Sequence, residues 1–401
     1  MDKCWLRCSK CFQKIDFDLI GRCICKGTLL VEYDLEKINL LFNKQILKKR
    51  SIASLWRYHE ILPIRNFDSI VTLGEGWTPL VRLHSLEKKL SLKQIWIKRE
   101  EQNPTGSFKA RGFSVAVSLL SVRGIKKVTV PSNGNAASAL SAYAGRAGMQ
   151  AYVFLPQDCP PQIIEECKHY GAFTFLVDGM IHDAGKIIEE GKTEQGWFNA
   201  GTLQEPGRVE GKKTMGFEIA EQLNWKLPDV IVYPTGGGSG IIGIWKAFHE
   251  LKALGFIRGC LPRLISVQEE GCQPIVDAME NASLPTKLSL HSATNPTGLR
   301  VPFPPDLDLV VSILKETNGA AIAVSKEEIR SAQQTLGSLG ISSSPEGAAT
   351  FAGLLRLHDK KAITEKETVV LFNTSHALKY MPWKPSDMAV IRNYSEFKSL
   401  I

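Results

Sequence analysis

A lysine at the start of an expected helix is the residue in this sequence best suited to covalent catalysis. Lys109 lies in the segment 103–112 (NPTGSFKARG), which follows an apolar strand expected at 94–98. A helix N-terminus and withdrawal from water both lower the pKa of a lysine, and Schiff-base chemistry requires a neutral amine. The alternative is a solvated surface lysine, which describes most other lysines here. A phosphate-binding P-loop is excluded, because the spacing from Gly106 to Lys109 does not fit that motif.

Polar side chains follow a second strand, expected at 127–130. The turn at 131–137 (PSNGNAA) offers Ser132, Asn133 and Asn135, and its small residues let main-chain amides approach a ligand. Open α/β sheets bind ligands at the carboxyl ends of their parallel strands. The turn is therefore a candidate binding segment, and an ordinary strand-to-helix connection is the alternative.

A glycine-rich turn follows a third strand, expected at 230–233. Residues 234–243 (PTGGGSGIIG) place a run of main-chain amides before a helix, and such a run binds anions. The candidate phosphate-binding residues are Gly236, Gly237, Gly238, Ser239 and Gly240. The stretch also contains a G-x-G-x-x-G pattern, and Glu269 and Glu270 end the next strand. A nucleotide-binding unit of an NAD-dependent dehydrogenase is therefore an open alternative.

Cysteines cluster near the N-terminus. The pairs Cys8/Cys11 and Cys23/Cys25 flank a short segment, as in a zinc ribbon, where two turns each offer two thiolates to a tetrahedral ion. The alternative is a ribbon without metal that packs as a small apolar unit. Residues 1–34 are expected to form this zinc-ribbon-like unit. None of these cysteines belongs to the turns above, so we expect the ribbon to matter only for its own folding.

Short apolar segments alternate with helical ones along most of the chain. Strands are expected at 94–98, 127–130, 151–155, 174–177, 230–233, 264–268 and 368–372. Helices between them include 112–123, 136–147, 162–170, 212–223 and 241–254. This alternation predicts an α/β protein with parallel sheets covered by helices on both faces. Residues 35–68 are expected to be a helical connection, and a Pro-rich loop at 296–305 interrupts the last third.

The composition excludes several classes of protein. With 401 residues, 44 % hydrophobic and 22 % charged, the chain is globular and long enough for two or three domains. The net charge is +8, and the basic residues are scattered, so nucleic-acid binding is not expected. No apolar run approaches the roughly 18 residues of a membrane span, and no signal peptide is evident at the start. We therefore expect a cytoplasmic protein without membrane or nucleic-acid partners.

Further motifs lie at 74–80 (GEGWTPL), 208–214 (RVEGKKT), 344–349 (SPEGAA) and 373–379 (NTSHALK). Together with the turns and the cysteine-rich start, in this order, they resemble the fold-type II pyridoxal-phosphate enzymes, and within them the threonine synthases. The resemblance implies two lobes with the cofactor in the cleft between them. The large lobe would comprise 35–112 with 230–401, and the small mobile lobe 113–229. It also implies a homodimer.

The resemblance assigns the cofactor to particular residues. Lys109 would hold pyridoxal phosphate covalently, Asn135 would bond its 3-oxygen, and Thr374 would meet its pyridine nitrogen. The amides of 236–240 would bind its phosphate.

The substrate would be a phosphorylated amino acid. Its carboxylate and phosphate would bind to Ser132, Asn133 and Arg208. Arginine suits phosphate because its planar fork bonds two oxygens at once, and Arg208 precedes an expected helix whose N-terminal turn would also attract an anion.

The implied reaction is the conversion of O-phospho-L-homoserine and water to L-threonine and phosphate, by a carbon–oxygen lyase. Two departures from the family pattern keep other substrates open. Ala110 stands where many relatives have aspartate, and Glu205 stands where asparagine is expected, close to Arg208. A carboxylate there would repel phosphate. The alternatives are a serine or threonine dehydratase, a β-replacing synthase acting on a phosphorylated amino acid, and a non-catalytic paralogue.

Overall fold

The computed structural model describes residues 4–64, 66–280, 297–381 and 390–398. All seven expected strands are present, and each end lies within one residue of its expected position. They are β5 (Gln94–Arg99), β6 (Lys127–Pro131), β7 (Gln150–Pro156), β8 (Phe173–Val177), β10 (Val230–Pro234), β11 (Arg263–Glu269) and β13 (Thr368–Asn373). The alternating pattern therefore predicted the α/β class correctly.

Six strands form the larger sheet, in the order β12-β11-β10-β13-β5-β4, with β12 at Ala320–Val324 and β4 at Leu80–Arg82. Neighbouring strands run parallel, except that β4 is antiparallel to β5. Strand β10 is apolar throughout because helices cover both faces of the sheet. On one face lie α8 (Gly207–Gln222), α9 (Ser239–Ala253) and α11 (Leu307–Glu316). On the other lie α3 (His84–Leu90), α12 (Lys326–Ser338) and α13 (Pro345–Asp359).

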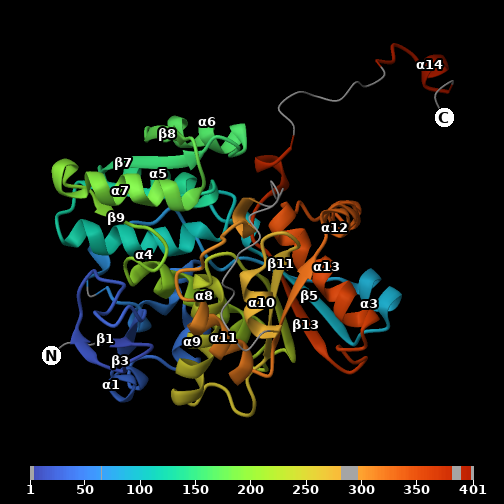
Figure 1. Ribbon diagram of the computed structural model, residues 1–401. Coiled ribbons are helices and arrows are strands. Elements are labelled where there is room, and N and C mark those ends of the chain that lie inside the picture. Colours follow the sequence, from blue (N-terminus) through green and yellow to red (C-terminus); the bar gives the residue numbers. More distant parts are fainter. Residues whose placement is uncertain (1–3, 65, 281–296, 382–389, 399–401) are drawn as a thin grey trace.

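Four parallel strands form the smaller sheet, in the order β8-β7-β6-β9, with β9 at Phe198–Asn199. Helices α4 (Lys109–Val122), α5 (Asn135–Arg146) and α6 (Pro161–His169) pack on one face, and α7 (Ile181–Gln195) packs on the other. In Figure 1 this sheet lies at the upper left and the larger sheet at the lower right. The boundaries expected for two lobes stay a prediction, and α8, expected in the small lobe, packs against α9 of the larger sheet.

The N-terminal unit is a three-stranded antiparallel sheet of order β2-β1-β3. Its strands are β1 (Cys4–Cys8), β2 (Lys14–Asp16) and β3 (Leu29–Tyr33). Alternate side chains of β1 and β3 are buried, and they join the apolar core formed by α8 and α9. Figure 1 shows this unit at the lower left, next to α9. The ribbon therefore packs on the body of the protein and is not a separate domain on a linker.

The remaining elements are short. The connection expected at 35–68 consists of α1 (Leu35–Asn39), α2 (Lys44–Lys49), η1 (Leu55–Ile61) and η2 (Phe67–Ser69). The others are η3 (Glu100–Gln102), α10 (Pro274–Glu280), η4 (Thr297–Leu299), η5 (Ala377–Lys379) and α14 (Tyr394–Lys398). Of the expected Pro-rich loop, Pro296 lies outside the described residues.

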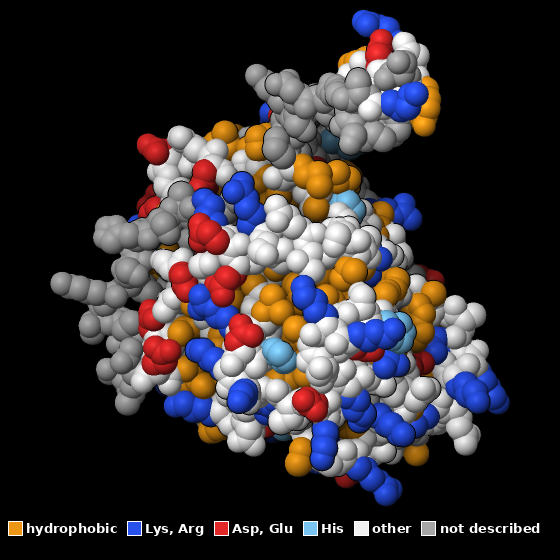
Figure 2. Space-filling model, turned by 90° about the vertical axis from the view of Figure 1, so that its right-hand side faces the viewer, with side chains coloured by type: hydrophobic (Ala, Val, Ile, Leu, Met, Phe, Trp, Pro, Cys, Tyr) orange, Lys and Arg blue, Asp and Glu red, His pale blue; other side chains and the backbone are white. Residues whose placement is uncertain are grey.

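The surface agrees with the charge pattern of the sequence. On the face shown in Figure 2, Lys and Arg side chains are spread out, with acidic side chains among them, and they do not gather into one basic patch. None of the helices in the described ranges is both long enough and apolar enough to cross a bilayer.

Candidate functional site

A cavity of about 520 Å³ lies where the carboxyl ends of strands from both sheets meet. Its walls include the three turns that the sequence indicated. All residues predicted for the cofactor and substrate line it, namely Lys109, Ser132, Asn133, Asn135, Arg208, Gly236, Gly237, Gly238, Ser239, Gly240 and Thr374. The fold thus brings together residues that are up to 265 positions apart, from Lys109 to Thr374.

Lys109 is the first residue of α4 and reaches into this cavity. Its Nζ lies 4.0 Å from the ring centroid of Phe108. The pKa of Lys109 is lowered to about 7, mainly by withdrawal from water and also by the nearby Arg208, while Glu346 partly opposes this. A substantial fraction of the amine is therefore neutral near pH 7, as the sequence predicted for a covalent catalyst.

The glycine-rich turn between β10 and α9 has no room for a side chain at Gly236 or Gly240. A Cβ on Gly236 would lie 2.4 Å from the main-chain oxygen of Gly298, and one on Gly240 would lie 2.0 Å from Oη of Tyr233. Gly238 has a φ of +79°, which L side chains rarely adopt. The first N–H groups of a helix lack partners within it. The turn therefore presents bare amides to the cavity and fits a phosphate group.

A chain of hydrogen bonds crosses the cavity wall opposite this turn. Asn135 donates through Nδ2 to Oη of Tyr380 at 2.6 Å, and Tyr380 donates to Oε1 of Glu346 at 3.0 Å. The amide of Asn135 has a second N–H, which is left to donate to a ligand. Burial raises the pKa of Tyr380 well above its usual range, and Glu346 adds to this, so the phenol stays protonated. The arrangement fixes the direction in which Asn135 can bond a cofactor oxygen.

The other predicted residues have defined partners. Ser132 accepts main-chain N–H bonds from Gly134 at 2.9 Å and Ala137 at 3.1 Å, so its hydroxyl proton remains to be donated. Asn133 donates to the main-chain oxygen of Arg300 at 2.9 Å. The main-chain oxygen of Thr374 accepts a 3.0 Å bond from the amide of Phe108, which connects Thr374 to the segment that contains Lys109.

Arg208 projects into the cavity from the start of α8 and is only 2 % exposed. Its NH1 donates to the main-chain oxygen of Ala200 at 2.8 Å, and its guanidinium carbon lies 4.6 Å from the ring centroid of Phe113. Its Nε has no hydrogen-bond partner among the residues that the structure describes. Burial lowers the pKa of Arg208 to about 10, against the attraction of Glu205. A buried guanidinium with an unused donor is suited to bind an anion.

The N-terminal turn of α8 does not offer free main-chain amides to a ligand, contrary to expectation. The sequence predicted that its N-terminal turn would attract an anionic ligand, but Glu205 occupies this position. Its Oε2 accepts from the amide of Gly207 at 2.5 Å and its Oε1 from that of Arg208 at 2.9 Å. The prediction is therefore wrong for these main-chain amides. The side chain of Arg208 is still available as a candidate to bind an anion. Burial raises the pKa of Glu205 to about 7.

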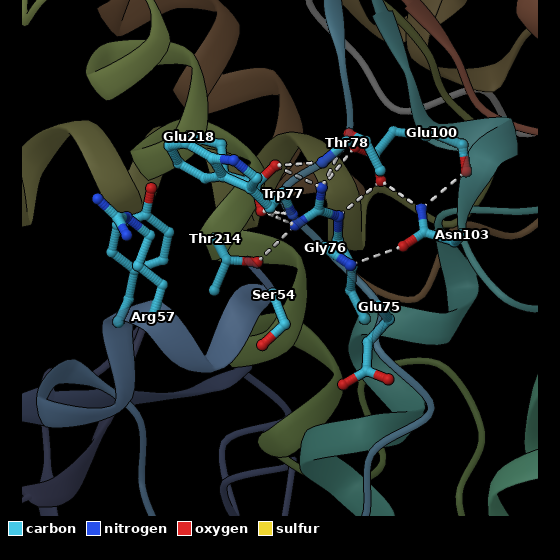
Figure 3. Close-up of polar contacts among 12 residues, drawn as sticks. Ser54, Arg57, Glu75, Gly76, Trp77, Thr78, Glu100, Asn103, Thr214 and Glu218 are labelled. Carbon is cyan, nitrogen blue, oxygen red and sulfur yellow. Dashed lines mark hydrogen bonds and ion pairs between the residues drawn. The ribbon is translucent and has the colours of Figure 1, made fainter. Parts of the chain in front are cut away.

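A buried ion network lies behind Lys109 and is shown in Figure 3. Arg111, one half-turn along α4, donates to both oxygens of Glu100 at 2.6 Å and also binds Glu218 of α8. Lys98 donates to Glu218 at 2.7 Å. The amides of Trp77 and Thr78 bind the same carboxylate at 2.7 and 3.2 Å. Through these bonds the GEGWTPL motif connects the start of α4 to α8. The two cations, Arg111 and Lys98, balance the charges of the two carboxylates, Glu100 and Glu218.

The four ribbon cysteines lie together, away from the cavity lining. Their Sγ atoms all lie within 4.8 Å of one another, with 3.3 Å between Cys8 and Cys25 and 3.7 Å between Cys11 and Cys23. Zn–S bonds of about 2.3 Å in a tetrahedron place sulfurs about 3.8 Å apart. The cluster therefore has the size and composition of a Cys₄ zinc site.

The ribbon also contacts segments that form the cavity. Thr28 donates to Oδ2 of Asp306 through its amide at 3.2 Å and its hydroxyl at 2.5 Å, and Arg22 donates to the main-chain oxygen of Pro305, a lining residue, at 2.7 Å. Gly21 packs so closely on Leu203 that a Cβ would lie 2.2 Å from its main-chain oxygen. The expectation that the ribbon matters only for its own folding stays a prediction, and these contacts join the ribbon directly to the cavity wall.

A family model described as "Pyridoxal-phosphate dependent enzyme" matches residues 71–375. The chain belongs to this family. Among its relatives in the family, the threonine synthase of Methanocaldococcus jannaschii is 36 % identical over 376 residues, which cover 93 % of this chain and 92 % of that protein. The threonine synthase of Synechocystis is 32 % identical over 339 residues, which cover 82 % and 85 %. The resemblance to threonine synthases is thereby confirmed.

Solved structures of the family share the fold. Maize serine racemase superimposes with a TM-score of 0.64 at 21 % identity, over 80 % of this chain and 91 % of that one. The processed form of threonine deaminase isoform 2 from Solanum lycopersicum gives a TM-score of 0.64 at 21 % identity, over 80 % and 82 %. The fold-type II expectation is confirmed. The family's cofactor is pyridoxal phosphate, so the dehydrogenase interpretation of the G-x-G-x-x-G pattern is rejected.

Sequence reasoning missed several residues around the cofactor cavity. Tyr380 directly follows the NTSHALK motif, and this adjacency was the only available signal. Glu346 lay inside a recognised motif but had no assigned role. Lys212 donates a hydrogen bond to Ser239. In the sequence it is one of two consecutive lysines, and nothing there distinguishes it from Lys213.

Proposed function

We propose that this protein converts O-phospho-L-homoserine and water to L-threonine and phosphate. The observation that carries the proposal is the buried guanidinium of Arg208, which forms no ion pair with any carboxylate that the structure describes. It lies in the same cavity as the low-pKa amine of Lys109, in a chain whose relatives are named threonine synthases. One site thus offers an amine for covalent attachment and a separate cation for a leaving phosphate.

The cofactor, when bound, supplies an aldehyde that bonds amines and a ring that accepts electrons from the substrate's α-carbon. Gly236–Gly240 would bind its phosphate through main-chain amides, and Asn135 would donate to its 3-oxygen. Thr374 would offer a hydroxyl to its pyridine nitrogen, and a hydroxyl, unlike a carboxylate, would not force protonation there. The weaker electron sink that results favours elimination and replacement over transamination.

Lys109 does the proton chemistry. Its Nζ would hold the cofactor in the absence of substrate and, once free, would take the proton from Cα. Because its pKa lies near 7, the same nitrogen can both take up and return a proton at neutral pH. Overall, the reaction would remove a proton from Cβ and release phosphate from Cγ, add a proton at Cγ to form the methyl group, add the hydroxyl of water at Cβ and return a proton to Cα. Lys109 would hold the cofactor again once threonine has left.

Three residues orient the substrate. The hydroxyl of Ser132 and the amide of Asn133 lie at one turn of the cavity and bind the carboxylate. Arg208 binds the phosphate, and burial strengthens this contact because little water competes for the guanidinium. The function is tested by supplying O-phospho-L-homoserine, O-phospho-L-serine and L-threonine in turn. Equal amounts of phosphate and threonine from the first substrate support the proposal, whereas 2-oxobutanoate formed mainly from threonine favours the dehydratase alternative.

We further propose that Cys8, Cys11, Cys23 and Cys25 bind one structural zinc ion. The support is the spacing of their sulfurs, which all lie within 4.8 Å of one another, as in a tetrahedral zinc–thiolate site. Burial of two of the four, Cys8 and Cys23, suits a closed site without an open coordination position. Elemental analysis should find about one zinc per chain.

We also propose a cytoplasmic homodimer. None of the nine cysteines, all of which the structure describes, forms a disulfide, which suits a reducing compartment. Phe173, Phe175 and Leu176 are 45–52 % exposed on the edge strand β8, and such apolar edges favour association. Sedimentation at several concentrations tests the dimer.

A further inference from the structure

A buried lysine beside the glycine-rich turn forms no ion pair with any carboxylate that the structure describes. Lys212 lies on α8, is 0 % exposed, and donates through Nζ to Oγ of Ser239 at 2.6 Å. Ser239 is the first residue of α9 and lines the cavity. Among the residues that the structure describes, no carboxylate lies within ion-pair distance of this amine. A buried charge without an ion-pair partner is costly, so an anion bound nearby would stabilise the charged form of this amine.

The other buried lysines of the same core show what a paired cation looks like. Lys213, the next residue, lies 2.6 Å from Glu210 and 2.9 Å from Glu250. Lys246 binds the same two carboxylates, and Lys98 binds Glu218. Lys212 differs from all of these in that its contact is a neutral hydroxyl on the wall of a ligand cavity.

We propose that Lys212 is a positioning residue for the cofactor's phosphate, acting through Ser239 to charge and orient the glycine-rich turn. An ammonium group can only donate hydrogen bonds, so Oγ of Ser239 must accept from Lys212. The hydroxyl proton of Ser239 is then free to point into the cavity and donate to the phosphate. The phosphate in turn supplies the negative charge that Lys212 lacks.

The electrostatic surroundings agree with this assignment. Burial lowers the pKa of Lys212 well below its usual range, and the nearby cations Arg208 and Lys109 lower it further, while Glu205 opposes them. A dianion in the turn acts in the opposite direction and favours the ammonium form. Two cations without carboxylate partners, Arg208 and Lys212, thus border one cavity. In this account Arg208 serves the substrate's phosphate and Lys212 serves the cofactor's.

The test compares two aldehydes that differ only in the phosphate. Full-length protein freed of cofactor is titrated with pyridoxal phosphate and with pyridoxal, and binding is followed by absorbance. Lys212→Met should weaken pyridoxal phosphate binding about 10- to 100-fold, the range expected for loss of a charge-assisted hydrogen bond. Pyridoxal affinity should change less than about twofold, because pyridoxal does not fill the turn. Equal losses for both ligands, or no loss for pyridoxal phosphate, would overturn the proposal.

Two further variants separate the effect of the charge of Lys212 from its effect on the orientation of Ser239. They also show whether a loss of binding reflects misfolding. Lys212→Gln keeps a donor without the charge and should give an intermediate loss for pyridoxal phosphate alone. Ser239→Ala removes the link, so adding Lys212→Met to it should cost much less than Lys212→Met costs in the native background. If the two losses instead multiply, Lys212 does not act through Ser239. The inference rests on the family's cofactor and not on the proposed substrate, so a protein that failed to make threonine should still pass this test.

Discussion

Glu205 binds the main-chain amide of Arg208, at 2.9 Å, and leaves the guanidinium of the same residue available. Within the described ranges no ion pair joins the two side chains. The carboxylate completes the first turn of α8, which suits its proximity to the positive end of the helix. The acid that stood out as a departure from the family pattern therefore has a structural role, and it does not neutralise the cation proposed to bind phosphate.

Removal of the Arg208 side chain should impair only phosphorylated substrates. Loss of a charge-assisted contact to a leaving group costs roughly 2–4 kcal/mol, or about 30- to 1000-fold in kcat/KM. Steady-state kinetics of Arg208→Ala on O-phospho-L-homoserine measure this. The control is any deamination of L-threonine or L-serine by the same variant. A small, equal effect on both kinds of substrate would mean that Arg208 does not bind phosphate.

Ionisation of Glu205 should weaken binding of the phosphorylated substrate as the pH rises. Burial raises the pKa of Glu205 to about 7, so the group is mostly neutral below that pH and negative above it. The negative form repels a phosphate at Arg208. We therefore expect KM for O-phospho-L-homoserine to rise between about pH 6 and pH 8 in the native protein and to rise less in Glu205→Gln. Parallel KM profiles for the two proteins would contradict this.

Attachment of the cofactor to Lys109 should follow the pKa of its amine. Only the neutral amine reacts, so the rate of pyridoxal phosphate uptake by cofactor-free protein should fall about tenfold per pH unit below pH 7 and level off above it. Borohydride reduction followed by peptide mapping should place the pyridoxyl group on Lys109. A label on another lysine, such as the exposed Lys126, would refute the assignment.

The buried network behind Lys109 should govern acid stability. Burial alone would raise the pKa of Glu218, but Arg111 and Lys98 hold it down to about 2. Its stabilising contribution is therefore complete above an ordinary carboxyl pKa of about 4.3 and is lost as the pH falls towards 2. Glu218→Gln should lower the free energy of unfolding by about 3–5 kcal/mol at pH 7. Urea unfolding should show this difference shrinking between pH 4.5 and pH 2.5, and a constant difference would contradict the assignment.

Contacts between the ribbon and the cavity should make activity sensitive to the ribbon. Asp306→Asn keeps a side chain that can cap α11 but removes the charge that binds Thr28 and Arg22. We expect this variant, and native protein stripped of zinc, to bind substrate several-fold more weakly. Asp308→Asn, on the exposed side of the same helical turn, is the matched control. Full activity of the stripped protein would support the view that the ribbon serves only its own folding.

The strands and the three turns were predictable because apolar runs and glycine-rich turns are local signals. The contact between Asn135 and Tyr380 was not, since it joins residues 245 positions apart and depends on how two sheets meet. The different partners of Lys212 and Lys213 could not be predicted from the sequence either. Consecutive helical residues point about 100° apart, so one lysine meets Ser239 and the other meets two carboxylates. Only the packing of α8 against α9 decides which is which.

The path of oxygen from water tests the proposed reaction most directly. The protein is incubated with O-phospho-L-homoserine in water enriched in oxygen-18, and both products are analysed by mass spectrometry. Because phosphate leaves Cγ with all its oxygens and water adds at Cβ, one labelled oxygen should enter the hydroxyl of threonine and none should enter phosphate. Labelled phosphate together with homoserine would reveal simple phosphate-ester hydrolysis, and it would contradict the proposed function.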